Sequence, residues 1–308
     1  MADINEDAAF ESILPIGRVA SESARSLDGS EGRRNVEAVL SRQDIHKKWI
    51  ENYRNPDNEE FYNGAFARIC DVVGPPEGKH MLDAGCGSLS HAMRFARRGY
   101  RLTAVDFSEG VLETARSNLN DEPNLSRQIA LQREDILNLP FEDESFTHVL
   151  CWGVLMHIPD VERAISELCR VLRDGGCFVV GEGSMRSLQS LVQRFLLSVS
   201  SNGKDYTRNT PAGVEMWRVT EDGMMLTRQA NIRWLKQTLS GKGLVVRKHW
   251  PGQFTELYTK TSSPRARSLI HKFNNFWFER VNSPLFSHGN ILVLQKLPPP
   301  SGQDAGRR

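Results

Sequence analysis

The chain of 308 residues carries 39 Lys and Arg against 38 Asp and Glu, which leaves a formal net charge of +1. This balance differs from that of a dedicated nucleic-acid binder, which usually has a strong basic excess. The hydrophobic share of 39% is typical of a globular protein with an adequate core. No stretch approaches the ~20 apolar residues of a membrane span, and residues 1–10 lack the apolar core of a signal peptide. We therefore expect a cytoplasmic protein without a membrane span or a nucleic-acid partner.

The cysteines are odd in number and none is spaced as C-x-x-C, which disfavours a disulfide framework and a zinc site. They are Cys70, Cys86, Cys151, Cys169 and Cys177. We expect reduced, mostly buried thiols and no metal.

Both ends of the chain are poor in large apolar residues. Residues 1–40 are predicted to be disordered or loosely packed, and residues 298–308, PPPSGQDAGRR, to form a frayed tail. The folded domain should span 41–297. Near its start, 44–53 and 58–73 place apolar residues at helical spacing, which predicts two helices.

From His80, short apolar runs alternate with amphipathic segments of helical length. We predict strands at 80–84, 101–106, 128–133, 146–152 and 176–182, with helices at 89–98, 109–118 and 160–172. This alternation indicates an α/β fold with a parallel sheet and helices on both faces. Beyond Gly183 the pattern is weaker: helices at 188–199 and 232–239, strands at 244–248 and 290–295, and irregular stretches at 200–230 and 250–288.

The most informative segment is MLDAGCGSLSHAMRFARRG, in which a strand runs into Gly85-Cys86-Gly87 and then a helix. Glycines permit a tight turn and close approach of a ligand, and the helix N-terminus supplies free N–H donors. The turn predicts a nucleotide-like ligand, although simple packing would also explain it. Asp106 ends the next strand, 21 residues after Gly85, at the spacing of a carboxylate that binds ribose hydroxyls. The alternative is a carboxylate that caps the following helix.

The kind of nucleotide follows from two residues beside the turn. Ser90 stands where the dinucleotide fingerprint has its third glycine. Asp83 places negative charge where a diphosphate would lie. Both features disfavour NAD and FAD and favour a ligand with a cationic end.

Four successive motifs resemble the class I S-adenosylmethionine-dependent methyltransferases of the small UbiE/UbiG-like type (methyltransferase type 11). They are LDAGCG, LTAVDFSEGVLETA, REDILNLPFEDESFTHVLCWGVLMHIPD and ELCRVLRDGGCFVVGE, which together cover residues 80–183. The resemblance implies a Rossmann-like, seven-stranded, mostly parallel sheet with helices on both faces. It also implies N-terminal lid helices and C-terminal cap insertions, at 184–230 and 250–288, that bind the methyl acceptor.

The resemblance further implies a set of cofactor-binding residues. Asp83, Gly85, Cys86 and Gly87 would surround the methionine part, Asp106 the ribose, Phe107, Asp135 and Ile136 the adenine, and the Trp152 backbone the methionine site. Tyr53 with Trp49 would close over the cofactor as part of a lid, although ordinary core packing explains these aromatics equally well. Leu89 stands where the family has a further glycine and could narrow the pocket, and Thr147 replaces a common Asp.

The predicted reaction is SN2 transfer of a methyl group to an oxygen or nitrogen of a small or medium-sized organic molecule. His157, on the segment after strand 146–152, is the candidate base, since an imidazole can accept a hydroxyl proton near neutral pH; a structural role is the alternative. The sequence CWGVLMH lacks the N/D-P-P-Y/F motif of DNA methyltransferases. Two other functions stay open: a non-catalytic S-adenosylmethionine-binding protein and a nicotinamide-dependent oxidoreductase.

The stretch between 248 and 290 combines aromatic and basic residues, which would suit an acceptor with an apolar and an anionic part. They are Phe254, Tyr258, Phe273, Phe276, Trp277, Phe278 and Phe286, with Lys260, Arg265, Arg267, Lys272 and Arg280. A plain amphipathic helix would explain the same residues.

Overall fold

The computed structural model describes residues 30–200 and 205–298. Its main sheet has seven strands in the order β3-β2-β1-β4-β5-β10-β9. The strands are β1 His80–Ala84, β2 Arg101–Asp106, β3 Ile129–Arg133, β4 Phe146–Trp152, β5 Leu172–Gly183, β9 Leu244–Pro251 and β10 Gly289–Lys296. Of these strands, only β10 runs in the direction opposite to the others, antiparallel to both β5 and β9. The predicted seven-stranded, mostly parallel sheet is confirmed.

The sheet is buried on both faces, as its apolar strand sequences require. In β1, Met81 belongs to one hydrophobic cluster and Leu82 to the other, because successive side chains point to opposite faces. One face is covered by α5 Pro56–Val73, α6 Ala92–Ala96 and α7 Glu109–Asn120, and the other by α8 Val161–Val171 and α10 Ile232–Gly241. The prediction of helices on both faces is confirmed.

Helix α6 is shorter than the predicted helix at 89–98. Gly87 and Leu89 both have positive φ, 53° and 67°, so the turn continues past the glycines before the helix begins. Leu89 nevertheless lies fully buried in the cluster beneath α5 and α6. Burial of its side chain offsets the strain that a non-glycine residue has in this conformation.

The prediction that 200–230 is irregular was wrong. A three-stranded antiparallel sheet is formed by β6 Tyr206–Thr210, β7 Gly213–Thr220 and β8 Gly223–Ala230. Gly213 and Gly223 begin β7 and β8 with φ of 141° and 151°, which side chains rarely adopt. Trp217 of β7 is buried and stacks on Tyr206 of β6, so cross-strand packing stabilises the hairpins.

The prediction of a loosely packed N-terminus is also wrong for residues 30–40. They form α3 Ser30–Leu40, whose Val36 and Leu40 are buried against Trp217 and Leu226 of the small sheet. The next helix is α4 Gln43–Tyr53. The remainder of the predicted N-terminal segment, 1–29, and most of the predicted tail, 299–308, lie outside the described residues.

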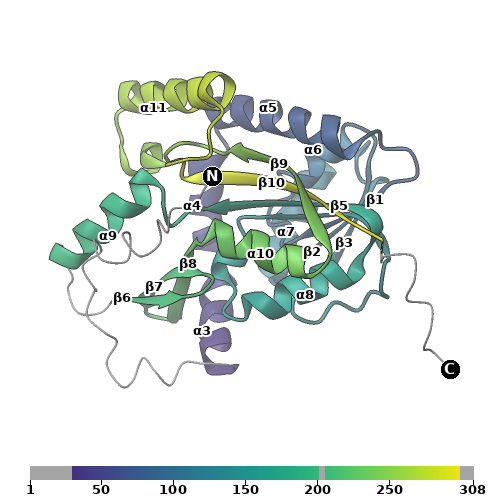
Figure 1. Cartoon of the computed structure of the whole chain (residues 1–308), viewed down its shortest axis with the longest axis horizontal. Coiled ribbons are helices and arrows are strands. Elements are labelled where there is room, and N and C mark those ends of the chain that lie inside the picture. Colours follow the sequence, from purple (N-terminus) through teal and green to yellow (C-terminus); the bar gives the residue numbers. More distant parts are fainter. Residues whose placement is uncertain (1–29, 201–204, 299–308) are drawn as a thin grey trace, which may run out of the picture.

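The cap segments contain further helices. The first carries α9 Leu188–Ser200. The second carries the 3-10 helix η2 Leu257–Lys260, α11 Pro264–Phe276 and the short π-helix η3 Trp277–Val281. Figure 1 shows α11 beside α5 along the top of the molecule, and α3, α9 and the small sheet at the left, beyond one edge of the main sheet. The second cap segment is thus largely helical.

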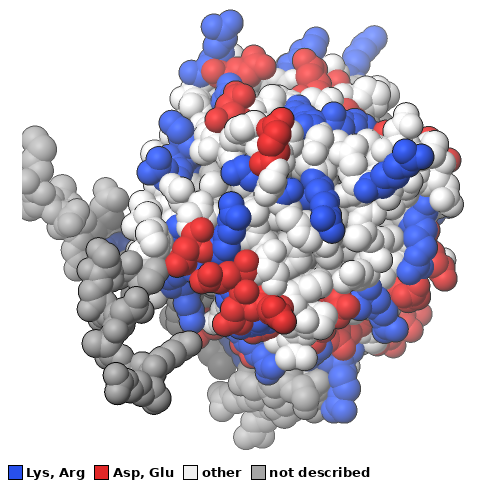
Figure 2. Space-filling view, turned by 90° about the vertical axis from the view of Figure 1, so that its right-hand side faces the viewer, with Lys and Arg blue, Asp and Glu red and all other residues white. Residues whose placement is uncertain are grey.

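The charges on the face seen in Figure 2 are mixed. Basic and acidic side chains alternate there, with one group of acidic residues in its lower part. This face therefore carries charges of both signs. Within residues 30–200 and 205–298, no helix is both long enough and apolar enough to cross a membrane.

Replacing Leu89 by Ala should lower the free energy of unfolding by about 2–5 kcal/mol, because a cavity replaces a fully buried side chain. Denaturant unfolding measures the change. The matched control is Leu269→Ala in α11, whose leucine is 70% exposed and whose loss should cost under about 0.5 kcal/mol. Equal stability of the two variants would contradict the core position of Leu89.

Candidate functional site

A cavity of about 2030 Å³ lies at the carboxyl ends of β1, β2, β4 and β5. Ligands of open parallel sheets bind at this edge. Residues of α3, α4, α9 and the small sheet line it from the other side. All the predicted site residues except Asp83 line this cavity: Tyr53, Gly85, Cys86, Gly87, Asp106, Phe107, Asp135, Ile136, Trp152 and His157.

The glycine turn brings the backbone up to the cavity. Gly85 has φ of 76°, and a Cβ atom there would lie 2.5 Å from Val154, so a side chain is excluded. Gly87 faces open space, with nothing within 4 Å of the position of a Cβ. A ligand can therefore approach the backbone at Gly87, as the sequence predicts.

Asp83 lies just behind the turn and is buried, and its Oδ2 atom has no hydrogen-bond partner among the described residues. Burial, with a smaller contribution from the Asp106 charge, raises the pKa of the Asp83 carboxyl to about 7. An unpaired buried carboxyl favours a nearby cation or hydrogen-bond donor. This orphaned oxygen fits a ligand with a cationic end.

Asp106 ends β2, and its two oxygens are held by backbone N–H groups. Oδ2 accepts from Gly87 N and Oδ1 from Ser108 N, both at 3.1 Å. The N-cap of α7 is Ser108, so Asp106 does not cap this helix itself but binds the backbone N–H of the capping residue, and it also lines the cavity. Each oxygen keeps a lone pair, which can accept a hydroxyl of a ligand. Burial raises the pKa of Asp106.

The predicted adenine residues lie together at the next strand end. Asp135 accepts a hydrogen bond from Leu137 N at 3.0 Å and forms an ion pair with Arg33 of α3. Ile136 and Phe107 are partly buried and also line the cavity. Arg33 was missed by the sequence analysis, since nothing in 30–40 indicated that this segment packs on the site.

Leu89 does not narrow the cavity. Its side chain points into the core beneath α5, and the cavity walls do not include it. The expectation that Leu89 narrows the pocket is therefore wrong, because this residue has a φ of 67° and lies fully buried in the core.

Trp152 ends β4, and its ring packs flat on Gly181, where a Cβ atom would lie 2.6 Å from the ring. The centroid of the His91 ring lies 5.1 Å from that of Trp152, and the ring stacks on Phe66 with centroids 4.9 Å apart. Its Nδ1 is buried without a partner in the described part of the chain. Burial, with a smaller contribution from the Arg94 charge, lowers the pKa of His91 to about 3, so the His91 ring itself is neutral near pH 7.

His157 lies on η1 Leu155–His157, and its Nδ1–H donates to the Leu226 carbonyl of β8 at 2.7 Å. The ring stacks on Trp49 of α4, with centroids 5.3 Å apart. Burial lowers its pKa, so the imidazole is neutral near pH 7. Nε2 has no partner within the described residues and keeps the lone pair that a base needs.

Glu182, at the end of β5, orients the segment that carries His157. Its Oε1 accepts from Leu155 N at 3.0 Å, and burial raises its pKa to about 8. Arg228 of β8 donates to the carbonyls of Leu155 and Ile158, each at 2.8 Å. The small sheet and β5 together therefore fix η1 in place.

Tyr53 takes part in a second polar group, which the sequence analysis missed. Its hydroxyl donates to Glu256 at 2.9 Å, and Glu256 and His288 both line the cavity. No local sequence signal marks them, and the antiparallel pairing of β10 with β5 brings them here. The first residues of β10, and those after β9, therefore lie at the same edge as the glycine turn.

Cys86 is buried inside the turn, and burial raises the pKa of its thiol well above the ordinary value. The thiol is protonated at neutral pH, which excludes it as an efficient nucleophile.

Stability should fall as the pH rises from about 4 to 7, because the unfolded chain loses the Asp83 proton in this range and the folded chain keeps it. In Asp83→Asn the side chain stays neutral at every pH, so the free energy of unfolding should fall by a few kcal/mol less over this range. Above pH 7 the variant should therefore be more stable than the wild type. Urea unfolding from pH 4 to 8 measures this. The raised pKa of Glu182 also lowers stability as the pH rises, but it does so equally in the wild type and in Asp83→Asn. The exposed control Asp71→Asn should follow the wild-type profile, and an unchanged slope in Asp83→Asn would refute the buried-acid assignment.

Comparison with known proteins gives a consistent result. Residues 82–180 match the family described as "Methyltransferase domain". A demethylmenaquinone methyltransferase from Desulfitobacterium hafniense is 40% identical over 117 residues, which are 36% of this chain and 45% of that protein. The chain spans about half the length of the first curated relatives that it matches.

Two solved structures share the fold. Magnesium protoporphyrin IX methyltransferase from Synechocystis, with bound SAH, is 15% identical and aligns with 85% of this chain and 99% of its own, with a TM-score of 0.56. A SAM-dependent methyltransferase from Methanosarcina mazei is 18% identical and aligns over 75% and 98%, with a TM-score of 0.52. Residues 82–180 therefore match a methyltransferase domain, and the chain shares the Rossmann-like class I fold of these two structures.

Proposed function

We propose that the protein transfers a methyl group from S-adenosylmethionine to an oxygen or nitrogen atom of a small or medium-sized organic acceptor. One observation carries the proposal: four strand ends bring the glycine turn, Asp106, Asp135 and Trp152 around one cavity, with the unpaired Asp83 carboxyl behind it. The family match at 82–180 supports it.

The residues present fit this cofactor. Asp83 would offset its cationic methionine end, Asp106 would accept its ribose hydroxyls, and Ile136 with Phe107 would contact its adenine. When bound, the cofactor supplies an electrophilic methyl group on a sulfonium that departs as a neutral thioether. The chain's own contribution is to bind, to orient the acceptor and to exclude water. His157, through Nε2, would take the acceptor's proton.

Asp83 also argues against a nicotinamide cofactor. A buried carboxyl directly behind the glycine turn would face the pyrophosphate of NAD, where negative charge is unfavourable. The sulfonium and ammonium groups of S-adenosylmethionine would instead be stabilised by the same carboxyl.

The cavity leaves room for an acceptor beside the cofactor, since pockets for one drug-sized ligand typically measure about 300–1,000 Å³ and this one about 2030 Å³. Arg194 of α9 lines it, and its Nε is buried without a partner in the described residues. This guanidinium supports the earlier inference of an acceptor with an anionic part. The curated relative named as a demethylmenaquinone methyltransferase supports an acceptor with an apolar body.

Calorimetric titration should detect micromolar binding of S-adenosylmethionine or S-adenosylhomocysteine. Asp106→Ala should weaken it by tenfold or more, because hydrogen bonds to a charged group are worth about 1.5–3 kcal/mol. The matched control Asp71→Ala, on the exposed side of α5, should bind like the wild type. Absence of binding by the intact protein would refute the proposed function.

Incubation with S-adenosylmethionine and a metabolite extract should release S-adenosylhomocysteine. His157→Ala should lower this rate about 100-fold or more while cofactor affinity stays within about threefold, as expected for loss of a general base. Binding without release in any extract would identify a binding protein without turnover. An unchanged rate in His157→Ala would assign this residue a structural role.

A further inference from the structure

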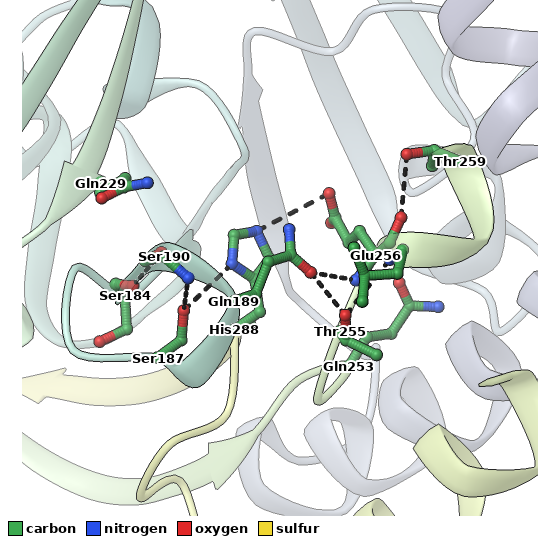
Figure 3. Close-up of polar contacts among 12 residues, drawn as sticks. Ser184, Ser187, Gln189, Ser190, Gln229, Gln253, Thr255, Glu256, Thr259 and His288 are labelled. Carbon is green, nitrogen blue, oxygen red and sulfur yellow. Dashed lines mark hydrogen bonds and ion pairs between the residues drawn. The ribbon is translucent and has the colours of Figure 1, made fainter. Parts of the chain in front are cut away.

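A second polar centre lies in the cavity, away from His157. It consists of Glu256, which precedes η2, with Tyr53 of α4 and His288, which precedes β10. Figure 3 shows the His288 ring turned toward the Glu256 carboxylate, with Gln189 and Thr255 beside them. Three segments far apart in the sequence thus converge on one carboxylate.

The carboxylate is used on one side only. Its Oε2 accepts from the Tyr53 hydroxyl at 2.9 Å and lies 3.7 Å from His288 Nε2. Its Oε1 has no partner among the described residues, and its side chain is 29% exposed on the cavity wall. The adjacent Glu256 charge raises the pKa of Tyr53, so the tyrosine keeps its proton and remains a donor.

Polar residues of α9 and α11 hold the backbone at Glu256 in position. Gln189 Oε1 accepts from Glu256 N at 2.7 Å and from the Thr255 hydroxyl at 2.6 Å. The fully buried Asn274 of α11 bonds to both the N–H and the carbonyl of Thr255, at 3.1 and 2.9 Å. These bonds fix the backbone from which the Glu256 side chain extends.

His288 is held as firmly. Its Nδ1 lies 3.4 Å from the hydroxyl of the fully buried Ser187, and its backbone N–H donates to Phe254 O at 3.0 Å. The ring packs on Gly183 at the end of β5, where a Cβ atom would lie 3.3 Å from it. The polar centre therefore lies at the end of β5. This strand is the neighbour of β4, whose last residue, Trp152, is predicted to line the methionine site.

Oε2 of Glu256 already accepts a hydrogen bond from Tyr53 at 2.9 Å, and His288 Nε2 lies 3.7 Å from the same oxygen. What its free Oε1 lacks is a single hydrogen-bond donor, and the nearby cavity walls of Tyr62 and Trp152 are aromatic. We infer that Glu256, positioned by Tyr53 and His288, is the specificity-determining residue for a hydroxyl group on an aromatic methyl acceptor. The inference rests on the proposed function and names the substrate class: a phenol-type compound with a hydroxyl that Glu256 binds.

The test uses probes that differ only in the recognised group. The protein, alone and loaded with S-adenosylhomocysteine, is titrated calorimetrically with 4-nitrophenol and with its methyl ether, 4-nitroanisole. The phenol should bind about tenfold more tightly, as expected for one hydrogen bond to a charged acceptor. In Glu256→Gln, which keeps the shape of the side chain, this preference should fall below about threefold.

Two further variants complete the design. Glu256→Asp, which withdraws the carboxylate by one methylene, should retain only part of the preference, and the exposed control Glu279→Gln should retain all of it. A preference that survives in Glu256→Gln, or no binding of either probe, would overturn the inference. Tighter binding of 4-nitrobenzylamine than of 4-nitrophenol would overturn it as well, because the carboxylate would then serve a cation.

The probes separate this inference from the proposed function. Glu256 is held by the protein itself, so the hydroxyl preference should be present with and without S-adenosylhomocysteine. Loss of S-adenosylhomocysteine binding with the preference intact would count against the proposed function alone. Binding of S-adenosylhomocysteine without any hydroxyl preference would count against the assignment of Glu256 alone.

Discussion

Parallel pairing of β1 with β2 and β4 is the constraint on which the rest of the structure depends. It brings the carboxyl ends of these strands to one edge, so residues 20 to 70 positions apart in the chain become neighbours around the glycine turn. Asp106 shows this directly, because its carboxylate accepts the N–H of Gly87 from the neighbouring strand end. The antiparallel β10 extends the same edge, since its first residue follows His288. One hydrogen-bonding pattern therefore places both polar centres of the cavity.

Burial of Asp83 opposes folding, and its persistence in the fold requires a reason. A carboxyl with an unpaired buried oxygen costs free energy relative to a solvated one, and its raised pKa expresses that cost. Side chains with strongly shifted pKa values are concentrated at functional sites. A cationic ligand in front of the turn would lower the cost, because it favours the ionised form of the carboxyl. Folding and ligand binding are thus coupled through a single side chain.

The sequence predicts the sheet well and the cap segments poorly, for a physical reason. Residues 80–183 alternate between strand and helix periods, and local burial decides each element, so β2 and β4 match their predicted bounds. The small sheet was missed because Trp217 is stabilised by α3, a segment too polar to indicate packing by itself. Glu256 and His288 were missed because neither is unusual in its local sequence. Only the tertiary fold brings them together.

The ion pair that joins α3 to the cavity wall at Asp135 is weaker than the packing around Trp152. Arg33 of α3 pairs with Asp135 at the predicted adenine position, but both side chains are more than one-third exposed, and ion pairs at such sites contribute only about 0–1 kcal/mol. At the ends of β4 and β5, in contrast, the cavity is closed by Trp152, which packs on Gly181, and by fully buried strand residues. This ion pair therefore contributes less to the stability of the site than the packing of Trp152 on Gly181, and α3 is held chiefly by its buried contacts with the small sheet.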